Sequence, residues 1–319
     1  MTTHPYRPSI PDEILALSHQ RDQLRRRGQY DRADLLKRQI EEAGYRVKDN
    51  PRGAHLATMP GVAVDGHLYR LTRLLPSLLD EADSCTYSVN ILGRNNLEQV
   101  QRCVESVLRH ADSTNLEIIL IDNASQDDLG TWAEERKAHE PRLHLLSATR
   151  PMGAAEAYNV GMKQSRGRYI LLLDPAIELT GNIFTPLENT LQEQQIGATG
   201  QRGLSTDNLR HFNESQQREV EAIDCQCMAF RRDWLKKTGL LDERYRFARY
   251  MDIDFNFALL DQGARNVVTP HLPLVNHADT QESRLSDAER TRLTKRNFYR
   301  FLAKWGDRDD LLTEPEVTG

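Results

Sequence analysis

Two acidic residues directly follow apolar segments whose composition predicts buried strands. Asp122 follows LEIILI at 116–121, and Asp174 follows YILLL at 169–173. Such a carboxylate can accept hydrogen bonds from a nucleobase or ribose, although a turn residue explains Asp122 equally well when it is taken alone. A second acid two places after Asp174 would complete an Asp-x-Asp pair, which marks a metal site, but that place holds Ala176. The sequence therefore raises the question of whether this site works without its second acid.

The elements that must position these acids alternate between strands and helices from Thr86 onward. Strand-like runs occur at 86–92, 116–121, 142–146 and 169–173, and helical patterns follow at 97–108, up to Trp132, and at 153–165. This alternation predicts an α/β fold with a mostly parallel sheet that helices cover on both sides. Ligands of such sheets bind beyond the carboxyl ends of the strands. We therefore expect the functional residues just after the strands.

An ordered set of motifs extends over residues 86–305. It includes IDNASQDD at 121–128, GAAEAYNVG at 153–161, LLLDPAIEL at 171–179, GLLDE at 239–243 and YMDIDF at 250–255. On these motifs the chain resembles a family 2 glycosyltransferase with the GT-A fold. The resemblance implies transfer of a sugar from a nucleotide-diphosphate donor to an unknown acceptor, usually with inversion and usually with Mg²⁺ or Mn²⁺.

Residue by residue, the resemblance implies one catalytic carboxylate, a metal pair and a donor-binding set. Asp252 falls on the general base, and Asp174 and His277 are the implied metal ligands. Two simpler explanations stay open: Asp252 is an acid at a helix start, where the dipole favours negative charge, and a lone histidine is often structural. The implied donor-binding residues are Leu92, Arg94, Asn95, Asp122, Gly153, Asn159 and Asp174.

Four departures from the family's motifs cluster on the donor site. They are Leu92-Gly93 after the first strand, Pro151, Ala176 and Met251. A methyl group cannot ligate a hard cation, which needs oxygen donors, and Glu178 is the one nearby acid that could substitute. The sequence supports an active transferase first. The alternatives are a catalytically impaired domain that binds a nucleotide sugar, and an RNA-linked binding protein.

The segment 1–55 predicts a helical hairpin that forms a small domain of its own. Its sequence resembles the C-terminal tail domain of bacterial cysteinyl-tRNA synthetases, because it contains, in order, Ala33-Asp34, Arg38, Gly44, Asp49 and Pro51. That resemblance implies a possible tRNA contact. The segment holds 11 Lys and Arg against 8 Asp and Glu, a net charge of +3, which a solvated helix face explains about as well.

The segments on either side of the main domain carry weaker signals. At 56–85 we expect a linker and one amphipathic helix over 66–81, whose leucine stripe would pack on the main domain or mediate self-association into a homo-oligomer. The stripe consists of Leu68, Leu71, Leu74, Leu75, Leu78 and Leu79. Residues 306–319 predict a flexible C-terminal tail.

The composition argues against several other classes of protein. With 39% hydrophobic and 28% charged residues, it is ordinary for a globular protein, and no apolar run approaches the roughly 20 residues of a membrane span. The start MTTHPYRPSIPDE lacks an apolar signal core, so a cytoplasmic location is expected. The net charge of −5 argues against a globally basic nucleic-acid binder. The four cysteines form no CxxC pair, so we expect reduced thiols.

Overall fold

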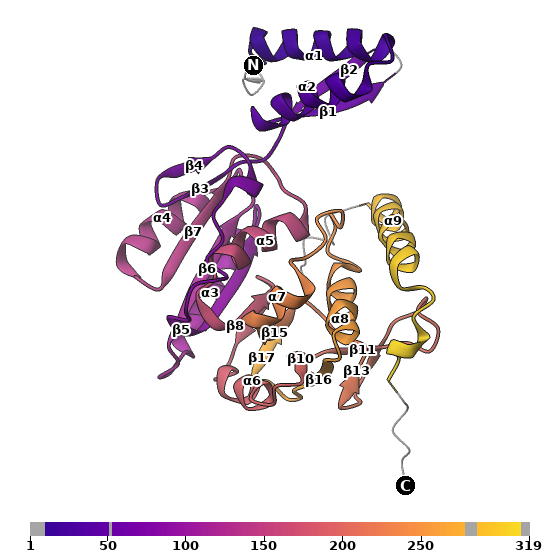
Figure 1. The fold of residues 1–319 in the computed structure, drawn as a ribbon. Coiled ribbons are helices and arrows are strands. Elements are labelled where there is room, and N and C mark those ends of the chain that lie inside the picture. The colour runs from indigo at the N-terminus through magenta and orange to yellow at the C-terminus, as the bar shows by residue number, and fades with distance from the viewer. Residues whose placement is uncertain (1–9, 51–52, 278–285, 314–319) are drawn as a thin grey trace. The chain divides into compact units, whose positions relative to one another are not determined.

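The computed structural model describes residues 10–50, 53–277 and 286–313 of the chain (Figure 1). The chain divides into two compact units, 1–74 and 75–319. Among the described residues, no helix combines the length and the apolar character that crossing a membrane requires.

The first unit opens with the expected pair of helices, α1 (Asp12–Arg26) and α2 (Tyr30–Glu42). An antiparallel hairpin of β1 (Tyr45–Asn50) and β2 (Gly53–Thr58) follows. The core of the unit consists of Ile14, Ile40 and Leu56, one residue from each helix and one from the hairpin. The expected boundary after residue 55 therefore falls inside β2.

A buried arginine ties the hairpin to the first helix. The Arg21 side chain is 1% exposed and donates two hydrogen bonds to the Asp49 carboxylate, at 2.7 and 3.0 Å. This contact lowers the pKa of Asp49. The Asp22 carboxylate also accepts a hydrogen bond from the Ala54 backbone N–H at 2.8 Å. These polar contacts compensate for the small apolar core of the unit.

The prediction of an amphipathic helix at 66–81 is wrong. The segment forms the short hairpin of β3 (Val62–Val64) and β4 (His67–Tyr69), a 3-10 turn η1 (Thr72–Leu74), and neither helix nor strand from 75 to 84. Positive φ angles at Asp65 and Gly66 make the turn of this hairpin. Pro76 lies inside the expected helix, where it would remove a backbone N–H. Leu68 and Leu74 are 51% and 55% exposed, so the leucines form no single buried stripe.

The second unit is built on one large sheet in the strand order β13-β16-β10-β15-β8-β5-β6-β7. The strands β5 (Cys85–Gly93), β6 (Leu116–Asp122), β7 (Leu143–Ala148) and β8 (Gly167–Leu173) are mutually parallel. The strand β15 (Cys227–Arg231) pairs antiparallel with both β8 and β10 (Ile196–Gly200). The strand β16 (Arg265–Val268) runs parallel to β10, and β13 (Glu219–Val220) closes the edge.

Helices cover both faces of this sheet. On one face, α3 (Leu97–Arg109), α4 (Leu129–His139) and α6 (Phe184–Leu191) share a hydrophobic core with Ile118 and Leu120 of β6. On the other face, α5 (Ala154–Gln164) packs so closely that a Cβ on Gly161 would lie 2.2 Å from Asn90 Oδ1 and 2.8 Å from Ile121 Cδ1. The alternation of side chains along β6 therefore serves two helical layers, as the α/β prediction requires.

The second unit contains further elements after β8. They are β9 (Ile177–Leu179), β11 (Gly203–Ser205), β12 (Asn213–Ser215), β14 (Ala222–Ile223), η2 (Arg232–Trp234), α7 (Leu235–Thr238), α8 (Met251–Asp261), β17 (Leu274–Asn276), α9 (Asp287–Trp305) and η4 (Asp309–Leu311). The prediction of a flexible tail at 306–319 is wrong for residues 306–313. Thr313 donates two hydrogen bonds to the Glu221 carboxylate, and Arg308 forms an ion pair with Asp261. Residues 314–319 lie outside the described residues.

Candidate active site

A cavity of about 630 Å³ opens beyond the carboxyl ends of β5 and β8. Leu92 and Arg94 line it from the end of β5, and Asp174 lines it from the end of β8. Asp252 reaches it from the first turn of α8. Four of the residues proposed from sequence therefore meet here. Three of them do so because parallel strands bring their carboxyl ends to the same edge of a sheet, whereas Asp252 comes from α8.

Asp174 is held in a tight turn directly after β8. Its Oδ1 accepts a hydrogen bond from the Ala176 backbone N–H at 2.8 Å, and its own N–H donates to the Gln226 carbonyl oxygen at 2.9 Å. Burial raises the pKa of Asp174, and the nearby Asp224 raises it further, against the hydrogen bond from Ala176. The Ala176 side chain is completely buried. The second place of the Asp-x-Asp pattern thus contributes only its backbone to the acid at the first place.

Asp252 is the most strongly perturbed carboxyl group in the cavity. Its Oδ2 accepts a hydrogen bond from the Cys225 N–H at 3.2 Å and its Oδ1 from the Ile253 N–H at 2.9 Å. Its exposed fraction is 7%. Burial, followed by repulsion from Asp224, raises the pKa of Asp252 to about 7. A carboxylate with such a pKa can accept a proton at neutral pH.

Asp254 has a different role from its neighbour Asp252. Its carboxylate accepts hydrogen bonds from Lys304 Nζ at 3.0 Å, from Trp305 Nε1 at 2.9 Å and from the Tyr245 hydroxyl at 3.3 Å. Asp254 therefore anchors α9 to α8.

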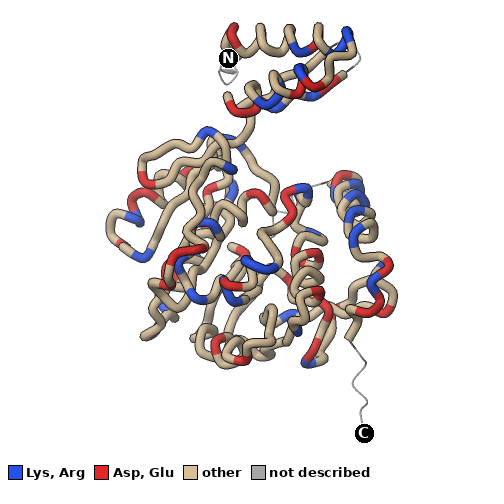
Figure 2. The backbone as a smooth tube through the Cα atoms, in the orientation of Figure 1, with Lys and Arg blue, Asp and Glu red and all other residues tan. Residues whose placement is uncertain are grey.

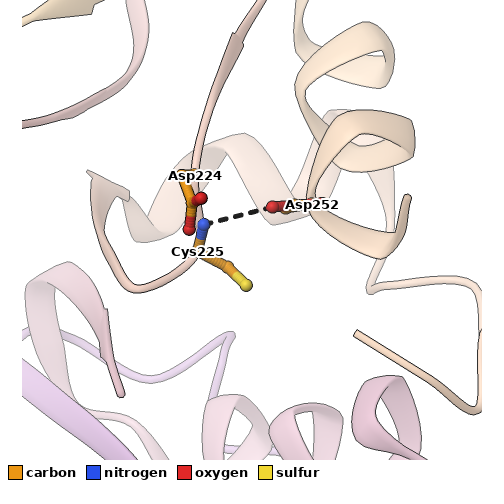
Figure 3. Close-up of side chains that lie close together, drawn as sticks. All are labelled: Asp224, Cys225 and Asp252. Carbon is orange, nitrogen blue, oxygen red and sulfur yellow. Dashed lines mark hydrogen bonds between the residues drawn. The ribbon is translucent and has the colours of Figure 1, made fainter. Parts of the chain in front are cut away.

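Asp224 and Cys225 belong to the site, although the sequence reading assigned them no role there. Figure 3 shows both side chains beside Asp252, with the hydrogen bond from Cys225 N to Asp252. They lie just before β15, separated from it by Gln226, and Cys227 of β15 pairs with Leu173 at the end of β8. Because β15 runs antiparallel to β8, its start lies where β8 ends. An acid just before a buried strand is the signal that could have found Asp224, but its use requires knowing the strand direction.

Two predicted donor-binding residues, Asp122 and Asn95, hold the loops around the cavity together. Asp122 Oδ1 accepts a hydrogen bond from the Ser125 N–H at 2.9 Å, and Asn95 Oδ1 accepts one from the Gln126 N–H at 2.6 Å. Neither residue lines the cavity, whereas Asn123 does. Contact of Asp122 or Asn95 with a nucleotide stays a prediction.

Gly153 and Asn159 also act through their neighbours. A Cβ on Gly153 would lie 2.9 Å from Arg246 Cα, so only glycine allows that backbone to approach. The Asn159 amide donates to the Leu241 carbonyl oxygen at 2.9 Å and to Glu243 Oε1 at 3.2 Å, and Asn159 Oδ1 accepts from the Leu241 N–H at 2.9 Å. We interpret Asn159 as the residue that positions the GLLDE turn.

His277 directly follows β17, which pairs with β9 in a small two-stranded sheet. Its Nε2 lies 2.7 Å from Glu178 Oε2, and its N–H donates to the Ala176 carbonyl oxygen at 2.9 Å. The structure does not place His277 in the lining of the cavity. Glu178, the one acid that could have substituted for Ala176, is engaged by this histidine and lies 3.8 Å from Arg102 Nε.

The residues present do not fit the divalent cation that an Asp-x-Asp motif would hold. Within the described part of the chain, one group of three His, Cys, Asp or Glu residues has its possible ligand atoms within 4.8 Å of one another. It consists of Asp224, Cys225 and Asp252. Mg²⁺ takes about six oxygen ligands, and a thiol suits it poorly. The expected pair, Asp174 and His277, does not appear in any such group among the described residues.

Comparisons with known proteins agree with this architecture. A family model described as "Glycosyl transferase family 2" matches residues 88–267. An uncharacterized protein of Sinorhizobium fredii, y4gI, is 22% identical over 297 residues, which cover 84% of this chain and 32% of that protein. The Escherichia coli enzyme named "UDP-Glc:alpha-D-GlcNAc-diphosphoundecaprenol beta-1,3-glucosyltransferase WfaP" is 36% identical over 87 residues, which cover 27% of this chain and 34% of that enzyme. The chain thus spans about a third of the length of these curated relatives.

A solved structure confirms the GT-A fold. The crystal structure of GalNAc-T7 with UDP, GalNAc and Mn²⁺ superposes with a TM-score of 0.58 at 16% sequence identity, and the match covers 71% of this chain and 49% of that chain. At this identity the likeness concerns the fold alone.

Proposed function

Since the chain belongs to glycosyl transferase family 2, we propose that it moves a sugar from a nucleotide-diphosphate donor to an acceptor, with inversion at the anomeric carbon. The observation that carries the proposal is Asp252, a buried carboxylate on the wall of the cavity with a pKa raised to about 7. The hexosyl nature of the sugar and the identity of the acceptor belong to the same proposal.

The proposed reaction is a single displacement. Asp252 takes the proton from an acceptor hydroxyl while the acceptor oxygen forms a bond to the anomeric carbon. The bond from that carbon to the diphosphate oxygen breaks, and its electron pair leaves with the diphosphate. Because attack occurs opposite the leaving group, the configuration inverts. A base with a pKa near the working pH combines a large ionised fraction with a useful affinity for the proton.

The use of Mg²⁺ or Mn²⁺ stays a prediction. GalNAc-T7 was solved with Mn²⁺, and a cation supplies positive charge for the departing diphosphate in such enzymes. In this chain Ala176 occupies the second acid's place. Turnover measured in EDTA and after addition of each cation tests the requirement directly.

A domain that binds the donor without transferring its sugar is the second candidate function, and the buried Ala176 favours it. To decide between the two, the protein is incubated with a panel of nucleotide sugars, alone and with added glycan acceptors, and released nucleoside diphosphate is measured. The proposed function predicts release that Asp252→Asn abolishes and the control Asp261→Asn keeps, since Asp261 lies at the far end of α8. Asp252→Asn turnover equal to wild type would refute the assignment of the base.

An RNA contact of the first unit also stays a prediction. Arg26 and Arg27 are exposed at the end of α1, and the segment 1–55 carries its small positive excess. A gel-shift titration with tRNA at low and high salt, comparing the full chain with a variant that lacks 1–74, tests it. Equal binding by both proteins would remove the hypothesis, as would the absence of any shift at low salt.

A further inference from the structure

Five arginines line the cavity of the second unit, more cations than its acids balance. They are Arg94, Arg202, Arg246, Arg249 and Arg296. Four acidic residues line the same cavity, among them Glu214. Burial raises the pKa of three of these acids, Asp174, Asp224 and Asp252. The cavity therefore attracts anions rather than cations.

Most of these arginines form no ion pair with an acid among the described residues. Arg202 is engaged, because it lies 3.1 Å from Glu214 and 3.4 Å from Asp224. Among the described residues, the other four guanidinium groups form no ion pair, although Arg249 lies close enough to Asp224 to oppose the rise in that acid's pKa. An arginine that faces a cavity without a partner is available to a ligand.

Two of these arginines, Arg246 and Arg249, lie in the loop 242–250, and hydrogen bonds from α5 and α9 fix the backbone of this loop from two sides. On one side, the Arg246 and Tyr245 carbonyl oxygens accept hydrogen bonds from the first N–H groups of α5, at 3.1 and 3.3 Å. On the other side, Asn297 of α9 donates to the Phe247 carbonyl oxygen at 3.0 Å and to the Arg249 carbonyl oxygen at 2.9 Å. Asn297 is 3% exposed, so this anchor is part of the packed structure.

The loop covers the N-terminus of α5. A helix N-terminus can bind phosphate through its free N–H groups, but here the loop accepts hydrogen bonds from two of those groups. A side chain at Gly153 would clash with the Arg246 backbone, so this close approach requires glycine. Basic residues also run along the neighbouring α9 (Figure 2). The positive charge at this wall of the cavity therefore comes from side chains of the loop and of α9.

We propose that Arg246 and Arg249 bind the donor's diphosphate and stabilise the charge that develops on it as the sugar leaves. A cation held by a complete Asp-x-Asp motif would supply positive charge for the same purpose, but here the motif lacks its second acid. The identity of this anion rests on the proposed function. A guanidinium group matches phosphate oxygens with two parallel hydrogen bonds, and a loop with an anchored backbone presents it at little cost in entropy.

The binding of inorganic pyrophosphate in EDTA tests this inference without any sugar transfer. Isothermal titration compares the full-length wild type with Arg246→Gln, Arg249→Gln and the double variant. Arg109→Gln, at an exposed position at the end of α3, loses the same charge outside the cavity. We expect wild-type binding that weakens with salt, a loss of about tenfold or more for each cavity variant, and no change in the control. Arg246→Lys keeps the charge and should retain part of the affinity.

The inference is overturned if the cavity variants bind pyrophosphate like the wild type, or if the wild type binds it only after Mn²⁺ is added. The two proposals fail separately. Pyrophosphate binding that depends on these arginines, without turnover of any donor, would refute the proposed function alone. Full sugar transfer by the Arg246→Gln, Arg249→Gln double variant would overturn this inference and leave the proposed function standing.

Discussion

Replacing Asp252 with asparagine should remove activity and yet stabilise the protein at alkaline pH. The carboxyl group is buried beside Asp224, and its pKa is about 7 against an ordinary value of 3.8. Because the folded state holds this proton more tightly than the unfolded state does, the group favours folding at low pH. That contribution is lost as the pH rises from about 4 through 7. Asparagine keeps one oxygen, which can accept from one of the two backbone N–H groups, and carries no charge to bury.

The size of the effect follows from the same values. One pH unit corresponds to about 1.4 kcal/mol, so between pH 5 and pH 8 the wild type loses at most about 3 kcal/mol relative to the variant. Since Asp224 shares the charge of this site, we expect about 1 to 3 kcal/mol. For a unit of this size each kcal/mol shifts the melting temperature by about 2 to 4 °C. Loss of a general base lowers turnover by about 10²- to 10⁴-fold.

The assay is thermal unfolding of the wild type, Asp252→Asn and Asp261→Asn at pH 5 and pH 8, together with turnover at pH 8. We expect the melting temperature of Asp252→Asn to exceed that of the wild type by several degrees more at pH 8 than at pH 5. Asp261→Asn loses a partly exposed ion pair with Arg308 at 2.6 Å, so its difference should be small and nearly independent of pH. A variant less stable than the wild type at pH 8, or one with an unchanged difference between the two pH values, would refute the reasoning about burial.

Three further substitutions test the supports of the site. Asn159→Ala removes three hydrogen bonds to the 241–243 turn and should cost about 2 to 4 kcal/mol of unfolding free energy in a urea titration; a cost below about 1 kcal/mol would contradict the clamp. Gly153→Ala places a Cβ 2.9 Å from Arg246 Cα, so pyrophosphate affinity should fall severalfold while the circular dichroism spectrum is kept; unchanged affinity would show that the loop tolerates the shift. Asp254→Asn weakens the contact between α8 and α9 and should lower the melting temperature at pH 8, the opposite of Asp252→Asn.

Local patterns were sufficient for the order of elements from β5 to β8. The alternation of apolar runs with helical periodicity is written in consecutive residues, so β5, β6, β7 and β8 and the helices between them were predictable. The acids at the ends of two strands were recognisable for the same reason. Pattern reading failed at 66–81, where a regular spacing of leucines outweighed Pro76 and the Asp65-Gly66 turn.

Ordered motifs were also sufficient to place Asp252 and Asp174 on one cavity. They did not distinguish residues that face the cavity from residues that position others. Asn159 matched a motif as readily as Asp174 did, yet its amide is occupied by the turn at Leu241. The reason is that a motif records which residues are required together, whereas the partner of a side chain depends on which distant segment folds against it.

The sequence by itself determined the parallel strands β5 to β8, Asp174 at the end of β8, Asp252 in a helix-start motif, and the missing acid at Ala176. Only the tertiary structure decided what surrounds them. The antiparallel course of β15 brings Asp224 beside Asp252, and the anchoring of the 242–250 loop between α5 and α9 presents Arg246 and Arg249 to the cavity. These contacts join residues that are far apart in the chain. No local periodicity encodes them, because their energy is gained only when the whole unit has packed.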